Sequence, residues 1–283
     1  MITRFAPSPT GPLHLGHAYS AILAHDMAMA ENGTFLLRIE DIDTARCRPE
    51  WEAAILNDLK WLGLTWEQPV LRQSDHLQRY ANALTLLADM GLCYACTCTR
   101  ADIHTALSAP QEGAPHLPPD GAVYPGTCRH LGLPLKGGAA AIRLDLDLAL
   151  ATLGPVSECS FNEIGPVAFG RYSLDPQSLR SKVGDVVLAR RDIGTAAYHL
   201  SVVLDDALQD VTHVVRGMDL FEATPIHHLL QVLLQLHTPT YYHHILIRDD
   251  QGKRLAKRDD AKSIAKFRAE GATPADIRTM VGL

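Results

Sequence analysis

Two histidines, His14 and His17, stand three residues apart at the end of a proline-rich segment near the N-terminus. Three prolines and a glycine within residues 7–12 exclude a helix or a central strand there and indicate a loop of fixed shape. A helical pattern follows at once and runs to residues 32–33, an Asn-Gly pair that suits a helix C-terminus. Helix N-termini attract anions through backbone N–H groups and the helix dipole, so this loop predicts a phosphate site with two imidazole donors. Two surface histidines in a Pro-rich turn are the alternative interpretation.

Charged side chains also follow two of the predicted strands. Residues 40–43 contain three carboxylates directly after an apolar strand at 34–39, and Arg216 ends a predicted strand at 211–217. Ligands of parallel α/β sheets bind at the carboxyl ends of strands, so these groups are candidates for substrate contacts. A guanidinium in that place could bind a carboxylate through two N–H groups. A solvated acidic turn and a salt bridge at the rim are the alternatives.

The elements that must position these groups alternate between helices and strands. Helices are predicted over residues 49–63 and 74–91, and further strands over 139–150, 182–192 and 242–247. This order fits a doubly wound α/β sheet. At 283 residues the chain can form one large α/β domain with an insertion, or two domains.

The composition is that of an ordinary soluble protein, with 47% hydrophobic and 20% charged residues. The N-terminal residues do not resemble a signal peptide and no apolar run approaches membrane-spanning length, so we expect a cytoplasmic protein without a membrane partner. The net charge of −6 argues against broad nonspecific binding of nucleic acid but allows a local basic patch. Six cysteines in a chain of this size favour thiols or a metal over disulfides.

Four of the cysteines fall in a stretch that differs from the rest of the chain. They flank a segment, residues 108–126, that is rich in Pro, Gly and Ala, and they are Cys93, Cys96, Cys98 and Cys128. Thiolates are the dominant ligands of four-coordinate zinc, and a C-x-C pair on a turn could supply two of them. Buried cysteines without a metal are the alternative, and by spacing alone a histidine would be a more usual fourth ligand than a tyrosine.

Residues 4–17 resemble the "HIGH" signature of class I aminoacyl-tRNA synthetases in the form used by the glutamyl branch, R-F-A-P-S-P-T-G-x-L-H-x-G-H. Leu15 stands where that signature has isoleucine. Residues 252–258 resemble the second class I signature, "KMSKS", with Arg254 in place of the first lysine and Ala256 in place of the serine. A basic run of this kind is otherwise a solvated face.

The segments between the two signatures resemble the same branch. They read L-R-I-E-D-x-D at 37–43, Y-x-L-x-x-V-x-D-D at 198–206 and V-x-H-V-V-R-G-x-D-L at 211–220. The resemblance therefore extends over nearly the whole chain. It implies an α/β fold with a Rossmann-like class I catalytic domain, a zinc-binding insertion and a short helical C-terminal tail. It also implies that L-glutamate and ATP, with Mg²⁺, react to glutamyl-adenylate and pyrophosphate. Nucleotidyltransferases and pantothenate-synthetase-like ligases also use H-x-G-H, but they do not need the glutamate-pocket residues.

Particular residues receive roles from this resemblance. The residues implied for ATP are Pro7, His14, Gly16, His17 and Lys257. Three of them are the implied catalytic groups because they would stabilise charge on the reacting phosphates, namely His14, His17 and Lys257. The residues implied for glutamate are Arg4, Ser8, Glu40, Tyr198 and Arg216, with Glu40 on the amino group.

The cysteine-rich stretch resembles the zinc-binding insertion of short bacterial paralogues of glutamyl-tRNA synthetase. Those paralogues share C-x-C followed by Y-x-x-x-C, which implies one structural Zn²⁺ on Cys96, Cys98, Tyr124 and Cys128. In them the acceptor is queuosine at the wobble position of tRNA-Asp, reached through the anticodon stem-loop. Only residues 259–283 follow the second signature, too few for the anticodon-binding domain of ordinary glutamyl-tRNA synthetases.

We therefore expect a monomer that activates glutamate without tRNA and then transfers it to queuosine. Charging of a tRNA 3′ end and noncatalytic RNA binding are the alternatives. Residues 1–92 are expected to form the first half of the catalytic domain, and 93–140 the start of the insertion. Residues 141–216 would complete the insertion and the catalytic domain, and 217–283 would form the KMSKS-like loop and the helical tail, without an anticodon-binding domain.

Overall fold

The computed structural model describes residues 1–99, 101–103, 123–135, 140–155, 159–247 and 262–283. Its strands are β1 (Ile2–Phe5), β2 (Thr34–Ile39), β3 (Leu71–Arg72), β4 (Cys93–Cys96), β5 (Ala141–Leu144), β6 (Ser160–Glu163), β7 (Gly170–Ser173), β8 (Val187–Ala189), β9 (His213–Gly217) and β10 (Thr240–His244). Its α-helices are α1 (Leu15–Ala30), α2 (Pro49–Trp61), α3 (Leu77–Asp89), α5 (Leu146–Thr152), α6 (Pro176–Ser178), α7 (Tyr198–Leu208), α8 (Thr224–Leu233), α9 (Ile264–Ala269) and α10 (Pro274–Val281). Shorter helical turns are η1 (Gln73–His76), η3 (Leu179–Val183) and η4 (Met218–Ala223).

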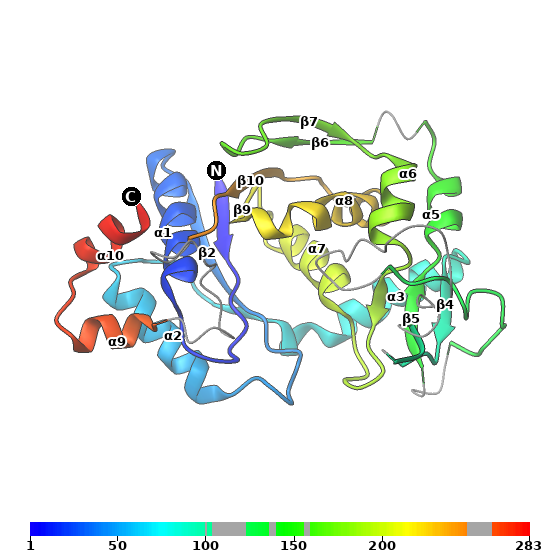
Figure 1. Cartoon of the computed structure of the whole chain (residues 1–283), viewed down its shortest axis with the longest axis horizontal. Coiled ribbons are helices and arrows are strands. Elements are labelled where there is room, and N and C mark those ends of the chain that lie inside the picture. Colours follow the sequence, from blue (N-terminus) through cyan, green and yellow to red (C-terminus); the bar gives the residue numbers. More distant parts are fainter. Residues whose placement is uncertain (100, 104–122, 136–139, 156–158, 248–261) are drawn as a thin grey trace.

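The parallel strands form the centre of the fold (Figure 1). β1, β2 and β3 pair in that order, and β9, β10 and β6 pair in parallel with β7 antiparallel at the edge. β1 lies beside β9, because the Ile2 amide donates to the Thr212 hydroxyl at 2.8 Å and the Thr212 amide donates to the Ile2 carbonyl at 3.0 Å. The strand order therefore reverses between β1 and β9, and open α/β sheets bind ligands at the carboxyl ends of such strands.

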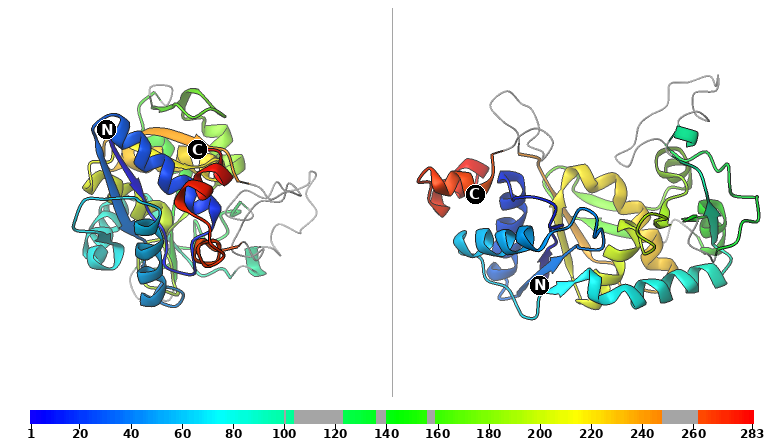
Figure 2. Two further views of the ribbon diagram at one scale, coloured as in Figure 1. Left: turned by 90° about the vertical axis from the view of Figure 1, so that its left-hand side faces the viewer. Right: turned by 90° about the horizontal axis from the view of Figure 1, so that it is seen from below.

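Helix α1 covers β1 and β2 with a face of small residues, which allows close packing on the strands. Ala18, Ala21, Ile22, Ala24 and Ala28 are all fully buried in this core. Helix α10 lies against α1 (Figure 2). The packing carries an ion pair, in which Arg278 Nη1 on α10 lies 2.5 Å from Asp26 Oδ2 on α1. Helix α9 lies beside α2 (Figure 1), where the Arg268 guanidinium lies over the Trp61 ring.

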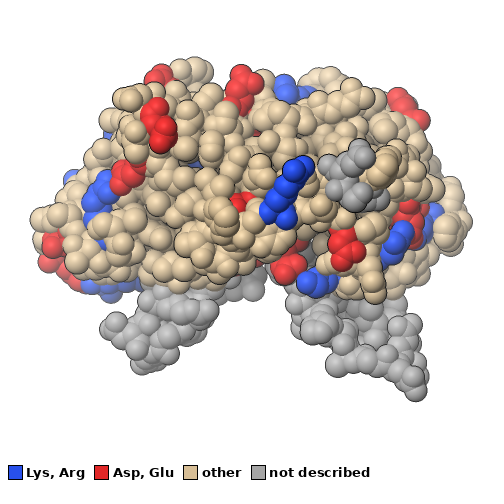
Figure 3. All heavy atoms as spheres, turned by 90° about the horizontal axis from the view of Figure 1, so that it is seen from above, with Lys and Arg blue, Asp and Glu red and all other residues tan. Residues whose placement is uncertain are grey.

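A second, antiparallel sheet of β4, β5 and β8 lies at the other end of the molecule (Figure 1). Helix α3 runs from the parallel strands toward this sheet (Figure 2). Its buried residues Tyr80, Ala83 and Leu87 share one core with residues of α5, α7 and α8. The described atoms of the face in Figure 3 have basic and acidic side chains interspersed on a mostly uncharged surface. None of the helices in the described ranges has the length and apolarity needed to cross a membrane.

Most of the predicted elements are confirmed, but the single strand predicted over residues 139–150 is wrong beyond Leu144. The Asp145 side chain accepts a hydrogen bond from the Leu148 amide at 3.1 Å and thereby caps α5. Leu148 is half exposed, because the helix turns it away from the core. The strand predicted over 182–192 is shortened in a similar way, because η3 occupies residues 179–183 and β8 begins at Val187.

Candidate active site

A cavity of about 400 Å³ opens at the carboxyl ends of β1 and β9. Seven of the residues predicted for ATP or glutamate line it, namely Arg4, His14, Gly16, His17, Glu40, Tyr198 and Arg216. Pro7 and Ser8 belong to the loop beside the cavity but are not among its lining residues. Lys257 lies outside the described residues. The fold therefore gathers most of the predicted site residues from four separate segments into one pocket.

The two histidines cap the start of α1. The Gly16 amide donates to His14 Nδ1 at 3.1 Å, and the His14 amide donates to His17 Nδ1 at 3.2 Å. The two ring centroids lie 3.8 Å apart. Because each Nδ1 accepts a backbone N–H, a neutral ring carries its proton on Nε2. The histidine side chains can thus offer Nε2–H groups to a phosphate at the helix N-terminus.

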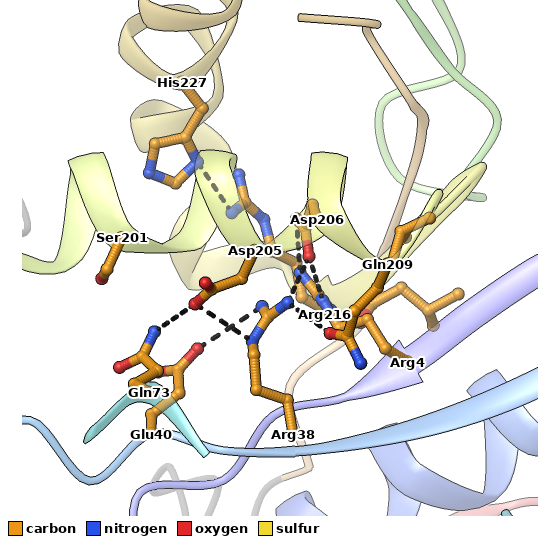
Figure 4. A network of polar contacts seen from close by, with 12 residues as sticks. Arg4, Arg38, Glu40, Gln73, Ser201, Asp205, Asp206, Gln209, Arg216 and His227 are labelled. Atoms are coloured by element: carbon orange, nitrogen blue, oxygen red, sulfur yellow. Dashed lines mark hydrogen bonds and ion pairs between the residues drawn. The ribbon is translucent and has the colours of Figure 1, made fainter. Parts of the chain in front are cut away.

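Below the cavity floor lies a buried cluster of ion pairs (Figure 4). Arg38 is fully buried, and its Nη1 lies 2.7 Å from Asp206 Oδ1. Arg4 binds the same carboxylate, with Nε 3.0 Å from Oδ1. Burial alone would raise the pKa of Asp206, but the two guanidinium groups outweigh it and lower that pKa to about 2. Arg4 therefore reaches the cavity with most of its charge already neutralised.

Glu40 occupies a different electrostatic position in the same cluster. Its Oε1 lies 3.6 Å from Arg38 Nη2, which is too long for a hydrogen bond, and its carboxylate accepts none from the described residues. Burial raises the pKa of Glu40 to about 7, since the lowering by Arg38 and Arg4 is incomplete. The backbone amide of Glu40 donates to the carbonyl of Pro7 at 3.0 Å, which ties this carboxylate to the histidine loop. The carboxylate oxygens of Glu40 can thus accept hydrogen bonds from a cationic group in the cavity.

Arg216 is buried and uses most of its donors within the protein. Among the described residues its guanidinium donates to four acceptors, namely His243 Nε2 at 3.0 Å, His227 Nδ1 at 3.1 Å, Leu220 O at 3.2 Å and Thr224 Oγ1 at 2.8 Å. Of the five N–H groups of a guanidinium, only one on Nη1 is left without a partner among the described residues. The bidentate contact that we expected from Arg216 does not fit this arrangement, and a contact through one N–H does. No carboxylate in the described ranges forms an ion pair with Arg216, so its positive charge is not neutralised at contact distance.

A second cavity of about 760 Å³ lies between the sheet of β4, β5 and β8 on one side and the start of α7, η4 and α8 on the other. It shares Tyr198 and Leu220 with the first cavity. Its lining includes four basic side chains, namely Arg143, Lys182, Arg190 and Arg191, and three carboxylates, namely Asp185, Asp192 and Glu222. Arg143 is buried, and its Nε has no hydrogen-bond partner in the described part of the chain. This cavity is therefore a place where an anionic or hydrogen-bonding group could approach the first pocket.

The four predicted zinc ligands lie together beside the second cavity. Tyr124 Oη is 3.4 Å from the sulfurs of Cys96 and Cys98, and the sulfurs of Cys98 and Cys128 are also 3.4 Å apart. The three sulfurs all lie within 4.8 Å of one another. Tetrahedral zinc with Zn–S bonds of about 2.3 Å separates its ligand atoms by about 3.8 Å, so the cluster fits the ion with small adjustments. Burial raises the pKa of Tyr124, so its phenol would need the charge of a cation to ionise.

Comparison with known proteins agrees with this geometry. The family model described as tRNA synthetases class I (E and Q), catalytic domain, matches residues 1–283. The Glutamyl-Q tRNA(Asp) synthetase of Rhodobacter capsulatus is 63% identical over 286 residues, which cover 100% of both chains. A protein of the same name from Nocardia farcinica is 42% identical over 284 residues, covering 98% of this chain and 82% of that one.

The chain belongs to the glutamyl-Q tRNA(Asp) synthetase family of class I synthetases. Among solved structures, a glutamate tRNA ligase from Elizabethkingia meningosepticum in complex with its amino acid has a TM-score of 0.75 at 26% identity. The match covers 99% of this chain and 60% of that ligase. A methionyl-tRNA synthetase from Mycobacterium tuberculosis has a TM-score of 0.63 at 10% identity, a likeness in fold alone. The expected class I α/β fold and the enzyme class, an aminoacyl-tRNA synthetase ligase that uses ATP, are confirmed.

Sequence reasoning missed the residues that support the pocket from behind. Arg38, Asp205 and Asp206 fall inside the segments that resemble synthetases, so the signal was present although no role was assigned to them. His227 and His243 are the acceptors for Arg216, and no motif marked them. They reach Arg216 only because the fold places α8 and β10 beside β9.

Proposed function

We propose that the protein activates L-glutamate with ATP, without tRNA, and transfers the glutamyl group to queuosine at the wobble position of tRNA-Asp. The observation that carries this proposal is that Glu40 and Arg216 both line one cavity beside a helix N-terminus. An acceptor carboxylate and an unneutralised guanidinium suit the ammonium and carboxylate groups of an amino acid. The identity of 63% to a Glutamyl-Q tRNA(Asp) synthetase supports the choice of glutamate and of this acceptor.

In the first step an oxygen of the glutamate α-carboxylate attacks the α-phosphorus of ATP. A new P–O bond forms, the bond from the α-phosphorus to the bridging oxygen breaks, and pyrophosphate leaves. Mg²⁺, when bound with ATP, would supply positive charge to the phosphates. His14 and His17 would offer Nε2–H groups to the phosphates, and Lys257 would stabilise the leaving pyrophosphate. Glu40 would hold the ammonium group, with Arg4, Ser8, Tyr198 and Arg216 completing the glutamate site. Pro7 and Gly16 would lie against the nucleotide.

In the second step a hydroxyl of the acceptor attacks the carbonyl carbon of the adenylate. A C–O ester bond forms, the bond from that carbon to the phosphate oxygen breaks, and AMP leaves while the hydroxyl proton passes to the leaving phosphate or to solvent. We infer that the acceptor reaches this carbon from the second cavity, since Tyr198 and Leu220 line both. Arg191, which is exposed on the lining of this cavity, suits a phosphate of an anticodon stem-loop. A structural zinc on Cys96, Cys98, Tyr124 and Cys128 would hold the insertion that forms the far wall, and the enzyme would act as a monomer.

ATP–pyrophosphate exchange tests the first step. Exchange with glutamate and no RNA is expected, whereas exchange that starts only when tRNA is added would contradict the proposal. No exchange with any amino acid would favour noncatalytic RNA binding. Arg216→Ala should raise the KM for glutamate, and Lys257→Ala should mainly lower kcat; equal effects on KM would contradict these roles.

Transfer of labelled glutamate tests the second step. Label should enter tRNA-Asp that contains queuosine and should be absent from the same tRNA without queuosine, with nuclease mapping placing it in the anticodon loop. Label at the terminal adenosine of tRNA-Glu would instead identify an enzyme that charges the 3′ end.

A further inference from the structure

Behind the first cavity, a buried carboxylate and a buried imidazole form a pair that the reaction itself does not use. Glu163 ends β6, His243 lies on the neighbouring strand β10, and both side chains are fully buried. His243 Nδ1 lies 2.5 Å from Glu163 Oε2. Neither residue lines the cavity. The other oxygen, Oε1, accepts the backbone amides of Gly165 at 2.6 Å and of His243 at 2.9 Å.

These contacts determine where the imidazole carries its proton. Burial alone would raise the pKa of Glu163, but the hydrogen bonds from His243 outweigh it and lower that pKa, so the carboxylate is ionised and only accepts. His243 must then donate from Nδ1, which leaves Nε2 as an acceptor. Arg216 Nε donates to this nitrogen at 3.0 Å. If His243 were protonated on both nitrogens, its Nε2–H would face the Nε–H of Arg216. This agrees with the pKa of His243, which burial lowers.

His227 provides a second acceptor on the other side of the guanidinium. Its Nδ1 accepts from Arg216 Nη1 at 3.1 Å, so its proton lies on Nε2, 3.0 Å from His199 Nδ1. The imidazoles of His243 and His227 accept from Nε and Nη1 of Arg216 and so fix the orientation of the guanidinium plane. The Glu163 carboxylate contacts the His243 imidazole and not Arg216 itself. Two neutral acceptors bind the guanidinium without neutralising its charge.

We propose that Glu163 and His243 are positioning residues of the amino-acid site, which set the proton of one imidazole so that Arg216 presents its remaining Nη1 N–H to the substrate carboxylate. The inference rests on the proposed function for the identity of that carboxylate. Binding of the substrate carboxylate would then depend on an ionised group outside the pocket, because the Glu163 carboxylate on β6 determines which nitrogen of His243 accepts from Arg216.

The isosteric variant Glu163→Gln tests this requirement. Two backbone N–H groups point at the Oε1 position, so the amide oxygen must stand there and the NH₂ group must face His243 Nδ1. His243 would then carry its proton on Nε2 and oppose the Nε–H of Arg216. The shape of the pair is kept, whereas the direction of its hydrogen bonds is reversed.

In glutamate-dependent ATP–pyrophosphate exchange, Glu163→Gln should raise the KM for glutamate by roughly tenfold, which corresponds to one misdirected hydrogen bond to a charged group. The KM for ATP and the kcat at saturating glutamate should stay within about twofold, because the phosphate site is unchanged. Tyr241→Phe is the matched control, since it keeps the ring that lies 5.3 Å from the Arg216 guanidinium and removes a hydroxyl whose partner among the described residues is Gln231. Imidazole ¹⁵N spectra, assigned with His243→Gln, should show the proton of His243 moving from Nδ1 to Nε2.

An unchanged KM for glutamate in Glu163→Gln, together with a moved proton on His243, would overturn the proposal. Should that variant fail to fold, His243→Gln and His243→Leu test the same contact with Arg216. Glutamine keeps an acceptor near the Nε2 position and should retain a low KM, whereas leucine should raise it; equal KM values would also overturn the proposal. Absence of exchange in the wild-type protein would instead refute the proposed function, so the two failures are distinguishable.

Discussion

Glu40 is the group whose charge should control glutamate binding across neutral pH. Burial raises its pKa to about 7, with Asp205 and Asp206 adding to the rise and Arg38 and Arg4 opposing it. Such a carboxyl is ionised to about nine-tenths at pH 8 and about one-tenth at pH 6. A carboxyl with a raised pKa loses its charge as the pH falls through that value, so the protein loses its ammonium acceptor in this window.

The expected result is a fall of about tenfold in kcat/KM for glutamate between pH 8 and pH 6, since this parameter reports the free enzyme. The kcat at saturating glutamate should change less, because the bound ammonium group stabilises the carboxylate and lowers its pKa. Both parameters are measured by glutamate-dependent ATP–pyrophosphate exchange at constant ionic strength.

Glu40→Gln keeps the shape of the side chain and removes its titration. A hydrogen bond to a charged group contributes about 1.5–3 kcal/mol, so the KM at pH 8 should rise by about 10-fold to 100-fold. The variant should show no inflection in kcat/KM between pH 6 and pH 8. Asp58→Asn is the control, because Asp58 also has a pKa raised, to about 6, but lies on α2 outside the cavity. An inflection near pH 7 that persists in Glu40→Gln would refute the reasoning.

Three further predictions concern the metal and the stability of the fold. Metal analysis should find one zinc per chain, and the double variant Cys96→Ser with Cys128→Ser should lose it and impair RNA transfer more than exchange; retained zinc would contradict the ligand set. Asp58→Asn should raise the free energy of unfolding by about 3 kcal/mol at pH 7.5 and by only about 0.5 kcal/mol at pH 4, because the folded pKa of about 6 lies above the unfolded value and the penalty is present in full only at higher pH. Urea unfolding measures it, exposed Glu50→Gln is the control, and an equal gain at both pH values would contradict the cause. Arg38→Met should cost about 3–5 kcal/mol by the same measurement, because it leaves Asp206 with a partner missing in the interior, and a cost below about 1 kcal/mol would show that the cluster is dispensable.

The local features of the site could be predicted from the sequence because short segments determine them. Pro7, Pro9 and Pro12 restrict the backbone whatever surrounds them, and the helix after His14 begins where the apolar pattern begins. The strand at residues 34–39 was predicted with its observed bounds, since a buried apolar run in a parallel sheet is a strong signal. The same local reasoning failed at Asp145, where alternating residues indicated a strand but one side chain capped a helix instead.

The direction of each donor and the charge of each group were decided by tertiary structure. Arg4, Arg38 and Arg216 are alike as residue types, yet two share Asp206 and the third faces imidazoles. Asp206 lies 168 positions from Arg38 in the chain, so a pattern within a short segment cannot predict their ion pair. Hydrogen bonding and desolvation depend on the atoms within a few ångströms, and those atoms come from strands that only the folded sheet brings side by side.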